Sequence, residues 1–264
     1  MNIFVRELKA NLKSLLIWGG IVIFFVFIGI SKFSAYEGNS EMLALLDDLP
    51  PALLSAFNFN AFNLTTITGF FGVMFTYFAL LLSISATMWG SDIISKEERD
   101  KTVEFSLTLP VPRSRLVTAK TLAAVVNCIG LLFITWGISI VSTAKYQPGS
   151  EFYDFLRLCV LALFIMQLIF LAIGIFLGCA MKQYKRASSV AVSLLLGTYF
   201  ISIISGLHKD LEFLKFFSPF KYFDAGVLLN ESKIDLTFVW ISAGIIAVCM
   251  LGAYISYARR DLYI

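Results

Sequence analysis

The chain has 264 residues, of which 58% are hydrophobic and 15% are charged, and its formal net charge at pH 7 is +3. A soluble domain of this size would expose much of that apolar surface to water, so the composition excludes an ordinary soluble protein. The small net charge, with no basic stripe, also argues against nucleic acid as a partner. We expect a single transmembrane domain over residues 1–264, with membrane lipid as its surroundings.

Six stretches of the chain contain no Asp, Glu, Lys, Arg or His, and as helices they are long enough to cross a hydrocarbon core of about 30 Å. They are residues 14–31, 64–91, 122–144, 158–181, 187–207 and 236–258. The first follows a basic segment, as in a signal peptide, but it is long for one and no clean cleavage site is evident. We expect it to be retained, which makes the fold class an all-α polytopic membrane protein with six transmembrane helices.

The distribution of charge between the connecting segments predicts the orientation of these helices. With a cytoplasmic N-terminus, the inner segments hold two thirds of the basic residues but fewer than half of the acidic ones. Basic residues remain preferentially on the cytoplasmic side of a membrane. The pattern therefore predicts a multi-pass protein of the plasma membrane with both termini in the cytoplasm.

Residues 2–13 precede the first span and have an amphipathic helical pattern. Phe4 and Leu8 lie on the apolar face of this pattern, with Arg6 and Lys9 among its polar positions. Two interpretations remain open: a helix lying in the membrane interface, or a basic flank that orients the first span.

The segment 92–121 is the only large connection on the inner side. Ser95 and Glu98 fit a capping box, and Pro110 ends or turns the helix that precedes it. Because the segment exposes both charged and apolar side chains, it predicts a docking element for a cytoplasmic partner. The candidate docking residues are Glu97, Glu98, Arg99, Thr102, Glu104, Phe105, Leu107 and Leu109.

Three motifs together resemble permeases of the ABC-2 type. The first is the sequence from Thr102 to Val111, Thr-x-Glu-x-x-Leu-x-Leu-Pro-Val, followed by Arg113, Arg115 and Lys120. The second is Phe217-Ser-Pro-Phe-Lys-Tyr-Phe-Asp224, and the third is Arg259-Arg260-Asp-Leu262 directly after the last span. The resemblance extends over essentially the whole chain.

This resemblance implies a six-helix subunit with an N-terminal interface helix at 2–13 and a cytoplasmic coupling helix at about 97–109. Short outer re-entrant helices at about 213–229 would lie in the outer region 208–235. Two such permeases, identical or different, would pair with two copies of an ATP-binding ABC ATPase subunit. Similar members are bacterial exporters of peptides, drugs or lipid-like molecules.

The energy source must come from another chain. The sequence contains no Gly-x-x-x-x-Gly-Lys-Ser/Thr loop to cradle a nucleotide phosphate, and the six spans contain no charged side chain to carry protons or ions. We therefore expect no catalytic, cofactor or metal site in this chain, with ATP and Mg²⁺ bound by a separate ATPase subunit. The charge-free interior suits an amphipathic cargo, with a peptide as the first choice. The alternatives are a membrane anchor or assembly factor for a cytoplasmic partner, and a gradient-driven secondary transporter.

Aromatic and polar side chains within the spans are candidates for lining a substrate path. They are Phe71, Phe75, Phe78, Asn127, Tyr199 and Phe200. Ordinary packing explains the aromatic residues equally well, and a hydrogen bond to a neighbouring helix is the alternative for Asn127 and for Gln167. Gly174 and Gly178 form a GxxxG motif, which allows another helix to approach closely.

Overall fold

The computed structural model describes residues 3–39, 50, 54, 62–99, 111–181 and 183–259, and this part of the chain is helical without any strand. Its long helices are α1 (Ile3–Ser31), α4 (Ile67–Arg99), α6 (Arg113–Thr143), α7 (Ser150–Ala180), α8 (Tyr184–Leu207) and α11 (Leu236–Arg259). Six described helices, which correspond to these, are long and apolar enough to cross a membrane. The predicted all-α fold with six spans is therefore confirmed.

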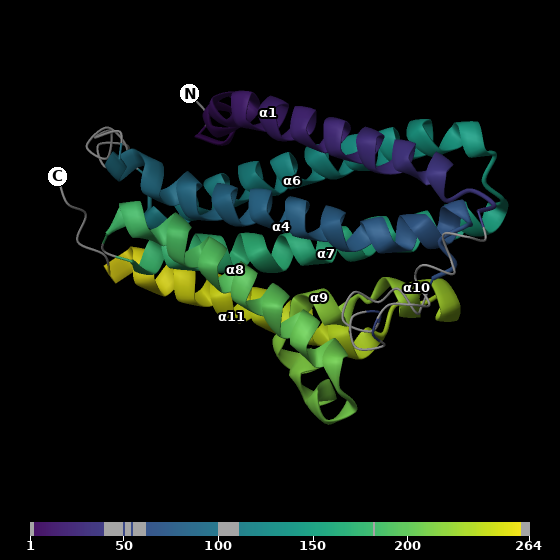
Figure 1. Ribbon diagram of the computed structural model, residues 1–264. Coiled ribbons are helices and arrows are strands. Elements are labelled where there is room, and N and C mark those ends of the chain that lie inside the picture. Colours follow the sequence, from purple (N-terminus) through teal and green to yellow (C-terminus); the bar gives the residue numbers. More distant parts are fainter. Residues whose placement is uncertain are drawn as a thin grey trace.

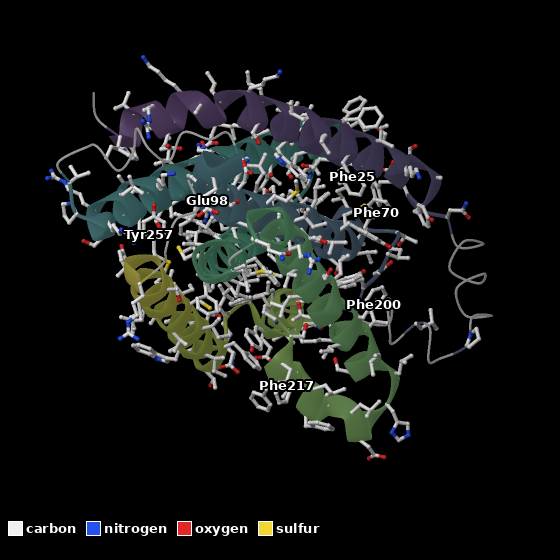
Figure 2. All side chains as sticks on the ribbon, turned by 90° about the vertical axis from the view of Figure 1, so that its left-hand side faces the viewer. Phe25, Phe70, Glu98, Phe200, Phe217 and Tyr257 are labelled. Atoms are coloured by element: carbon white, nitrogen blue, oxygen red, sulfur yellow. The ribbon has the colours of Figure 1, made fainter. Side chains whose placement is uncertain are left out.

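The six helices form a bundle whose centre is α4 and α7. Figure 1 shows α1 with α6 on one side of this pair and α8 with α11 on the other, and the view in Figure 2 gives the same order. The start of α1 and the end of α11 lie at the same end of the bundle, which we call the terminal end (Figure 1). The short helices before α11 lie at the opposite end.

Two helices continue beyond the predicted spans at the terminal end. Helix α4 runs to Arg99 and α6 already begins at Arg113, so most of the segment 92–121 is helical extension of these two spans. The absence of charged residues predicts only the part of a helix that lies in lipid. Lys, Glu and Arg are good helix formers, so the same helix can continue into water. The connection between the two helices is therefore much shorter than the charge pattern suggested.

Helix α1 shows the same effect at its N-terminal end. It is uninterrupted from Ile3 to Ser31, so the predicted boundary between an interface helix at 2–13 and a span at 14–31 corresponds to no break. The physical reason is that residues 3–18 contain neither Gly nor Pro, the residues that most often interrupt or kink a helix.

Helices α4 and α7 touch each other through their backbones. A Cβ atom added at Gly174 would lie 2.5 Å from the carbonyl oxygen of Thr87, and one added at Gly178 would lie 2.9 Å from the carbonyl oxygen of Ser91. Residues with a Cβ atom cannot approach another backbone so closely. The GxxxG motif therefore serves a contact within the chain.

Three short helices connect α8 to α11 at the opposite end: η4 (Lys209–Phe217), α9 (Pro219–Tyr222) and α10 (Ala225–Glu231). Pro219 occupies the first turn of α9, where a backbone N–H has no partner to lose. The Ser218 hydroxyl donates to the carbonyl oxygen of Thr198 at 2.7 Å, which attaches this region to α8. These helices occupy the segment 208–235, where the sequence resemblance placed short helices.

Candidate functional site

The predicted docking residues lie at the terminal end of the bundle. Glu97, Glu98 and Arg99 form the last turn of α4. The others, Thr102, Glu104, Phe105, Leu107 and Leu109, lie outside the described residues. The structure thus places the start of the predicted coupling helix at the end of a central helix, and the rest of that helix stays a prediction.

Beyond this segment, the start of α6 is attached to the end of α11. Arg113 Nη1 donates to the carbonyl oxygens of Tyr257 and Ala258, each at 3.3 Å. The last carbonyl groups of a helix have no partner within the helix, and a cation there also compensates the negative end of the helix dipole. The contact therefore holds the first turn of α6 beside the last turn of α11.

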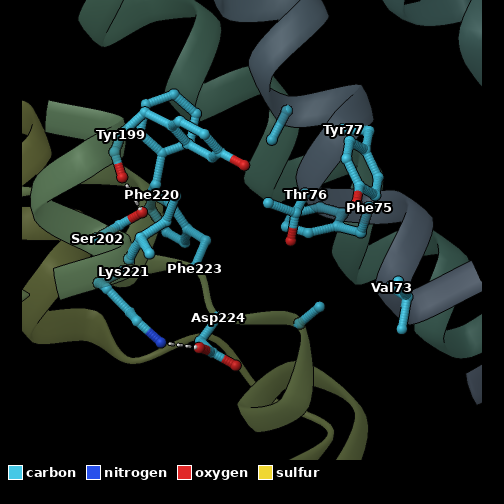
Figure 3. A pocket seen from close by; sticks show the side chains of 13 residues that line it. Val73, Phe75, Thr76, Tyr77, Tyr199, Ser202, Phe220, Lys221, Phe223 and Asp224 are labelled. Atoms are coloured by element: carbon cyan, nitrogen blue, oxygen red, sulfur yellow. Dashed lines mark hydrogen bonds and ion pairs between the residues drawn. The ribbon is translucent and has the colours of Figure 1, made fainter. Parts of the chain in front are cut away.

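A pocket lies near the opposite end, between α4, α8 and the short helices α9 and α10. Figure 3 shows Phe75, Thr76 and Tyr77 of α4 on one side and Tyr199 and Ser202 of α8 on the other. Its remaining lining residues are Val73, Ala79, Ile203, Phe220, Lys221, Phe223, Asp224 and Ala225. Of the predicted substrate-path residues, Phe75 and Tyr199 line it.

The pocket is small in this conformation. Its volume is about 50 Å³, whereas sites for drug-sized ligands hold about 300–1,000 Å³. The Tyr199 and Phe220 rings meet edge to face, with their centroids 5.3 Å apart. This contact joins α8 to α9 in the wall of the pocket, and a drug-sized ligand needs a wider pocket than this conformation offers.

The other aromatic candidates do not line this pocket. Phe71 and Phe78 are buried in the core, where their rings pack at 5.5 Å, and Phe71 also contacts Phe152 of α7 at 5.4 Å. Phe200 is 59% exposed and lies at the edge of the bundle (Figure 2). Ordinary packing accounts for Phe71 and Phe78, and Phe200 lies where lipid would contact it.

Six polar side chains of the described residues have buried hydrogen-bonding atoms without a partner, and three of them matter for the bundle interior. Asn127 Nδ2, Ser83 Oγ and both terminal atoms of Gln167 have no partner among the residues that the structure describes. The expected hydrogen bond from Gln167 to a neighbouring helix is therefore not formed within this part of the chain. Burying such groups without partners costs about 1–3 kcal/mol each, so the interior holds polar groups that can receive a ligand or a water molecule.

Ser83 of α4 and Gln167 of α7 lie at the same height along the two helix axes. Each lies seven residues, or about two helical turns, before a glycine of the contact, Gly90 in α4 and Gly174 in α7. Both helices run from the opposite end to the terminal end. Helical periodicity therefore places both side chains on the faces that α4 and α7 turn toward each other.

A wider pocket of about 730 Å³ lies among η4, α9, α10 and the start of α11. Its charged lining residues are Glu212, Lys215, Lys221, Asp224, Glu231, Lys233 and Asp235. Most of these charges are paired: Lys215 Nζ lies 2.7 Å from Glu212 Oε1, and Lys233 Nζ lies 3.3 Å from Glu231 Oε2. The hydrogen bond from Lys215 lowers the pKa of the Glu212 carboxyl, which keeps that group charged.

Lys221 and Asp224 line both pockets and so stand at the boundary between them. Their Nζ and Oδ2 atoms lie 3.0 Å apart, and the side chains are 21% and 17% exposed (Figure 3). Both residues belong to the second sequence motif, Phe217–Asp224, which by itself indicates no role for either of them. Lys221 lies at the end of α9 and Asp224 is the N-cap of α10, so the turn between these two short helices brings the pair together.

The described residues offer no group of three or more His, Cys, Asp or Glu side chains that could hold a metal ion. The pockets therefore present aromatic rings, hydroxyl groups and paired charges to a ligand. Such a set can bind and orient an amphipathic molecule, with its apolar part against the rings and its polar part near the Lys221–Asp224 pair.

Residues 1–262 match the family model described as ABC-2 family transporter protein. The match runs from before the start of α1 to beyond the end of α11, and so includes all six spans. No curated protein matches the chain.

Proposed function

Because this chain belongs to the ABC-2 transporter family, and is therefore a membrane subunit of an ABC transporter and not its catalytic subunit, we propose that it exports an amphipathic substrate. A peptide is the first choice, and a drug or lipid-like molecule is the second. The chain pairs with a second permease subunit, identical or similar. Two copies of an ATPase subunit bind ATP and Mg²⁺ and drive the transport.

The observation that carries this proposal is the pair of adjoining pockets near the opposite end of the bundle. The smaller one is lined by rings, among them Phe75 and Tyr199, and the wider one is lined by charges. An amphipathic molecule needs both environments, because apolar surface gains from leaving water whereas charged groups must stay paired or solvated. We place the wider pocket outside the cell, and the terminal end in the cytoplasm of a bacterial cell.

Helix α4 provides the route by which the ATPase acts on the smaller pocket. The helix is continuous from Ile67 to Arg99, so it connects the predicted coupling segment to Phe75 and Thr76 without a break. At about 1.5 Å per residue, Thr76 and Arg99 are about 35 Å apart along the helix axis. In our proposal, the ATPase docks at residues 97–109 and tilts α4 together with α7 relative to α8 and α9, which widens the smaller pocket.

Copurification of the tagged chain from its native membrane tests this assembly. We expect an ATPase subunit to copurify with the parent chain and with a control carrying Ser106→Asp and Thr108→Asp. It should be lost from a variant with Phe105→Asp and Leu107→Asp, because a docking surface depends on apolar anchors more than on neighbouring polar positions. Well-folded parent chain that brings down no ATPase activity would overturn the proposal.

Transport in sealed inside-out vesicles separates the export proposal from its alternatives. We expect such vesicles to accumulate a fluorescent hydrophobic peptide when ATP is added, and to stop when ATP hydrolysis is blocked. A membrane anchor would bind the ATPase without any such accumulation. A secondary transporter would accumulate the peptide in response to an ion gradient without nucleotide.

A further inference from the structure

A cluster of buried charges joins α1, α4 and α6 at the terminal end of the bundle. Glu7 of α1 has a side chain only 3% exposed, and its Oε2 atom accepts a hydrogen bond from Lys96 Nζ of α4. Its Oε1 atom lies 3.9 Å from Lys120 Nζ of α6 and 3.6 Å from Arg6 Nη2. One carboxylate therefore faces cations from its own helix and from two others.

Lys120 ties the cluster to the backbone of α4. Its side chain is completely buried, and its Nζ donates to the carbonyl oxygen of Ile93 at 2.8 Å. A lysine ammonium is almost never buried completely unless it is paired, because leaving water costs the ion several kcal/mol. Lys120 thus depends on Glu7 and on α4 at the same time.

The two lysines lie on either side of the predicted coupling segment along the chain. Lys96 is in the last turn of α4, just before residues 100–112, and Lys120 is in the second turn of α6, just after them. We call the parts of α4 and α6 that hold these lysines, residues 93–99 and 113–120, the stems of the segment. Glu7 is the point at which α1 holds both stems.

We propose that Glu7 is a positioning residue that locks α1 to the two stems, so that a movement imposed on the coupling segment is passed to α1 as well as to α4. This inference rests on the proposed function, because it needs an ATPase that moves the segment. Separating the helices would leave buried ammonium groups without their carboxylate, and breaking such a pair costs far more than breaking an exposed one. Exposed ion pairs would separate under the same movement, because water solvates the two charges.

A second polar contact holds α1 beside α4, closer to the C-terminal end of α1. Trp89 Nε1 donates to Ser14 Oγ at 2.8 Å, seven residues beyond Glu7 on α1. Seven residues correspond to about two helical turns, so both contacts come from one face of α1. This shared face keeps α1 from rotating about its own axis when the stems move.

Distances between pairs of spin labels in the complete permease–ATPase complex test the proposal. We choose three exposed positions: Leu12 on α1, Ser114 on the α6 stem and Phe200 on α8, each replaced by a labelled cysteine in a Cys249→Ser background. The Leu12–Ser114 pair reports whether α1 moves with the stem. The Ser114–Phe200 pair reports whether nucleotide moves the stem at all.

In the parent complex, vanadate-trapped nucleotide should change the Ser114–Phe200 distance and leave the Leu12–Ser114 distance unchanged. A change in both distances overturns the locking of α1 to the stem. No change in the Ser114–Phe200 distance is a different failure, because it removes the ATP-driven movement on which the proposed function depends. These outcomes need no variant at Glu7 and so hold even if such a variant does not fold.

The variant Glu7→Gln keeps the size of the side chain and removes its charge. We expect its Leu12–Ser114 distance distribution to broaden and to become sensitive to nucleotide, and Glu7→Asp to restore part of the narrow distribution. Glu151→Gln, the same change at an exposed site on α7, is the control and should match the parent. A Glu7→Gln complex with the narrow, nucleotide-insensitive distribution of the parent would contradict the proposal.

Discussion

Gly90 of α4 and Gly174 of α7 lie in direct backbone contact. A Cβ atom added to either glycine would lie 3.2 Å from the Cα atom of the other, and one on Gly90 would also lie 2.4 Å from the carbonyl oxygen of Leu171. Packed backbones resist sliding, because any shift brings atoms into overlap. Helices α4 and α7 therefore act as one rigid centre, against which α8 and α9 can move to open the smaller pocket.

Substitution of Gly174 by Ala should destabilise the protein. The new methyl group meets backbone atoms, which cannot rotate away as a side chain can, and overpacking of this kind costs about 1–3 kcal/mol. Gly197→Ala on α8 is the matched control, because nothing lies within 4 Å of a Cβ atom there. Thermal unfolding in detergent should show a lower Tm for Gly174→Ala only, and equal Tm values for the two variants would refute the close contact.

Substitution of Tyr199 by Ala should impair peptide accumulation in inside-out vesicles. The ring lines the smaller pocket and packs on Phe220, so its loss removes part of the apolar surface offered to a substrate. Phe200→Ala, at the next residue of the same helix, changes a ring that is 59% exposed and outside the pocket. It should transport as the parent does, and an equal loss in both variants would argue against this pocket as the substrate path.

The Lys221–Asp224 pair should affect substrate choice more than stability. Asp224→Asn removes the negative charge but can still accept the hydrogen bond that Asp224 Oδ1 receives from the Gly226 N–H at 2.9 Å. A partly exposed ion pair contributes about 0–1 kcal/mol, so we expect a small change in Tm. The ratio of transport between a cationic and an anionic fluorescent peptide should shift, and in opposite directions for Asp224→Asn and Lys221→Gln.

Gln167 offers a test of the buried polar groups. Gln167→Leu replaces a completely buried amide, which has no partner among the described residues, with an apolar side chain of similar size. Removing an unpaired buried polar group is neutral or stabilising, so the Tm should stay constant or rise. If the amide receives the substrate during transport, accumulation of the peptide should fall in the same variant. Unchanged transport would leave Gln167 without a part in the path.

The sequence alone determined the number and type of the spans. A stretch of about 20 residues without charge is a local property, and lipid leaves the helix as the usual way to satisfy its backbone. Likewise, the three motifs correctly indicated the family now shown by the match over residues 1–262. The short helices between α8 and α11 follow in part from local signals, such as Pro219 in the first turn of α9 and the Asp224 cap of α10.

The residues of the candidate site could be identified only from the tertiary structure. Phe75, Phe78 and Phe200 look alike in the sequence as aromatic residues of apolar helices, yet one lines a pocket, one packs in the core and one is exposed. A helix that is apolar all round gives no sign of which face lies against protein and which against lipid. The absence of charge predicts only the part of a helix that lies in lipid, whereas α4 continues beyond its predicted span to Arg99.

The cluster of Glu7, Lys96 and Lys120 could not be predicted from the sequence. Along the chain they are charges of the predicted inner segments, and nothing in the sequence indicates that they form one cluster. In the folded chain they meet inside the bundle, although 89 residues separate Glu7 from Lys96. Hydropathy and helix propensity depend on neighbours in the sequence and so decide which segments cross the membrane. Charge pairing depends on distance in space, and only the packing of α1 against α4 and α6 brings these three residues together.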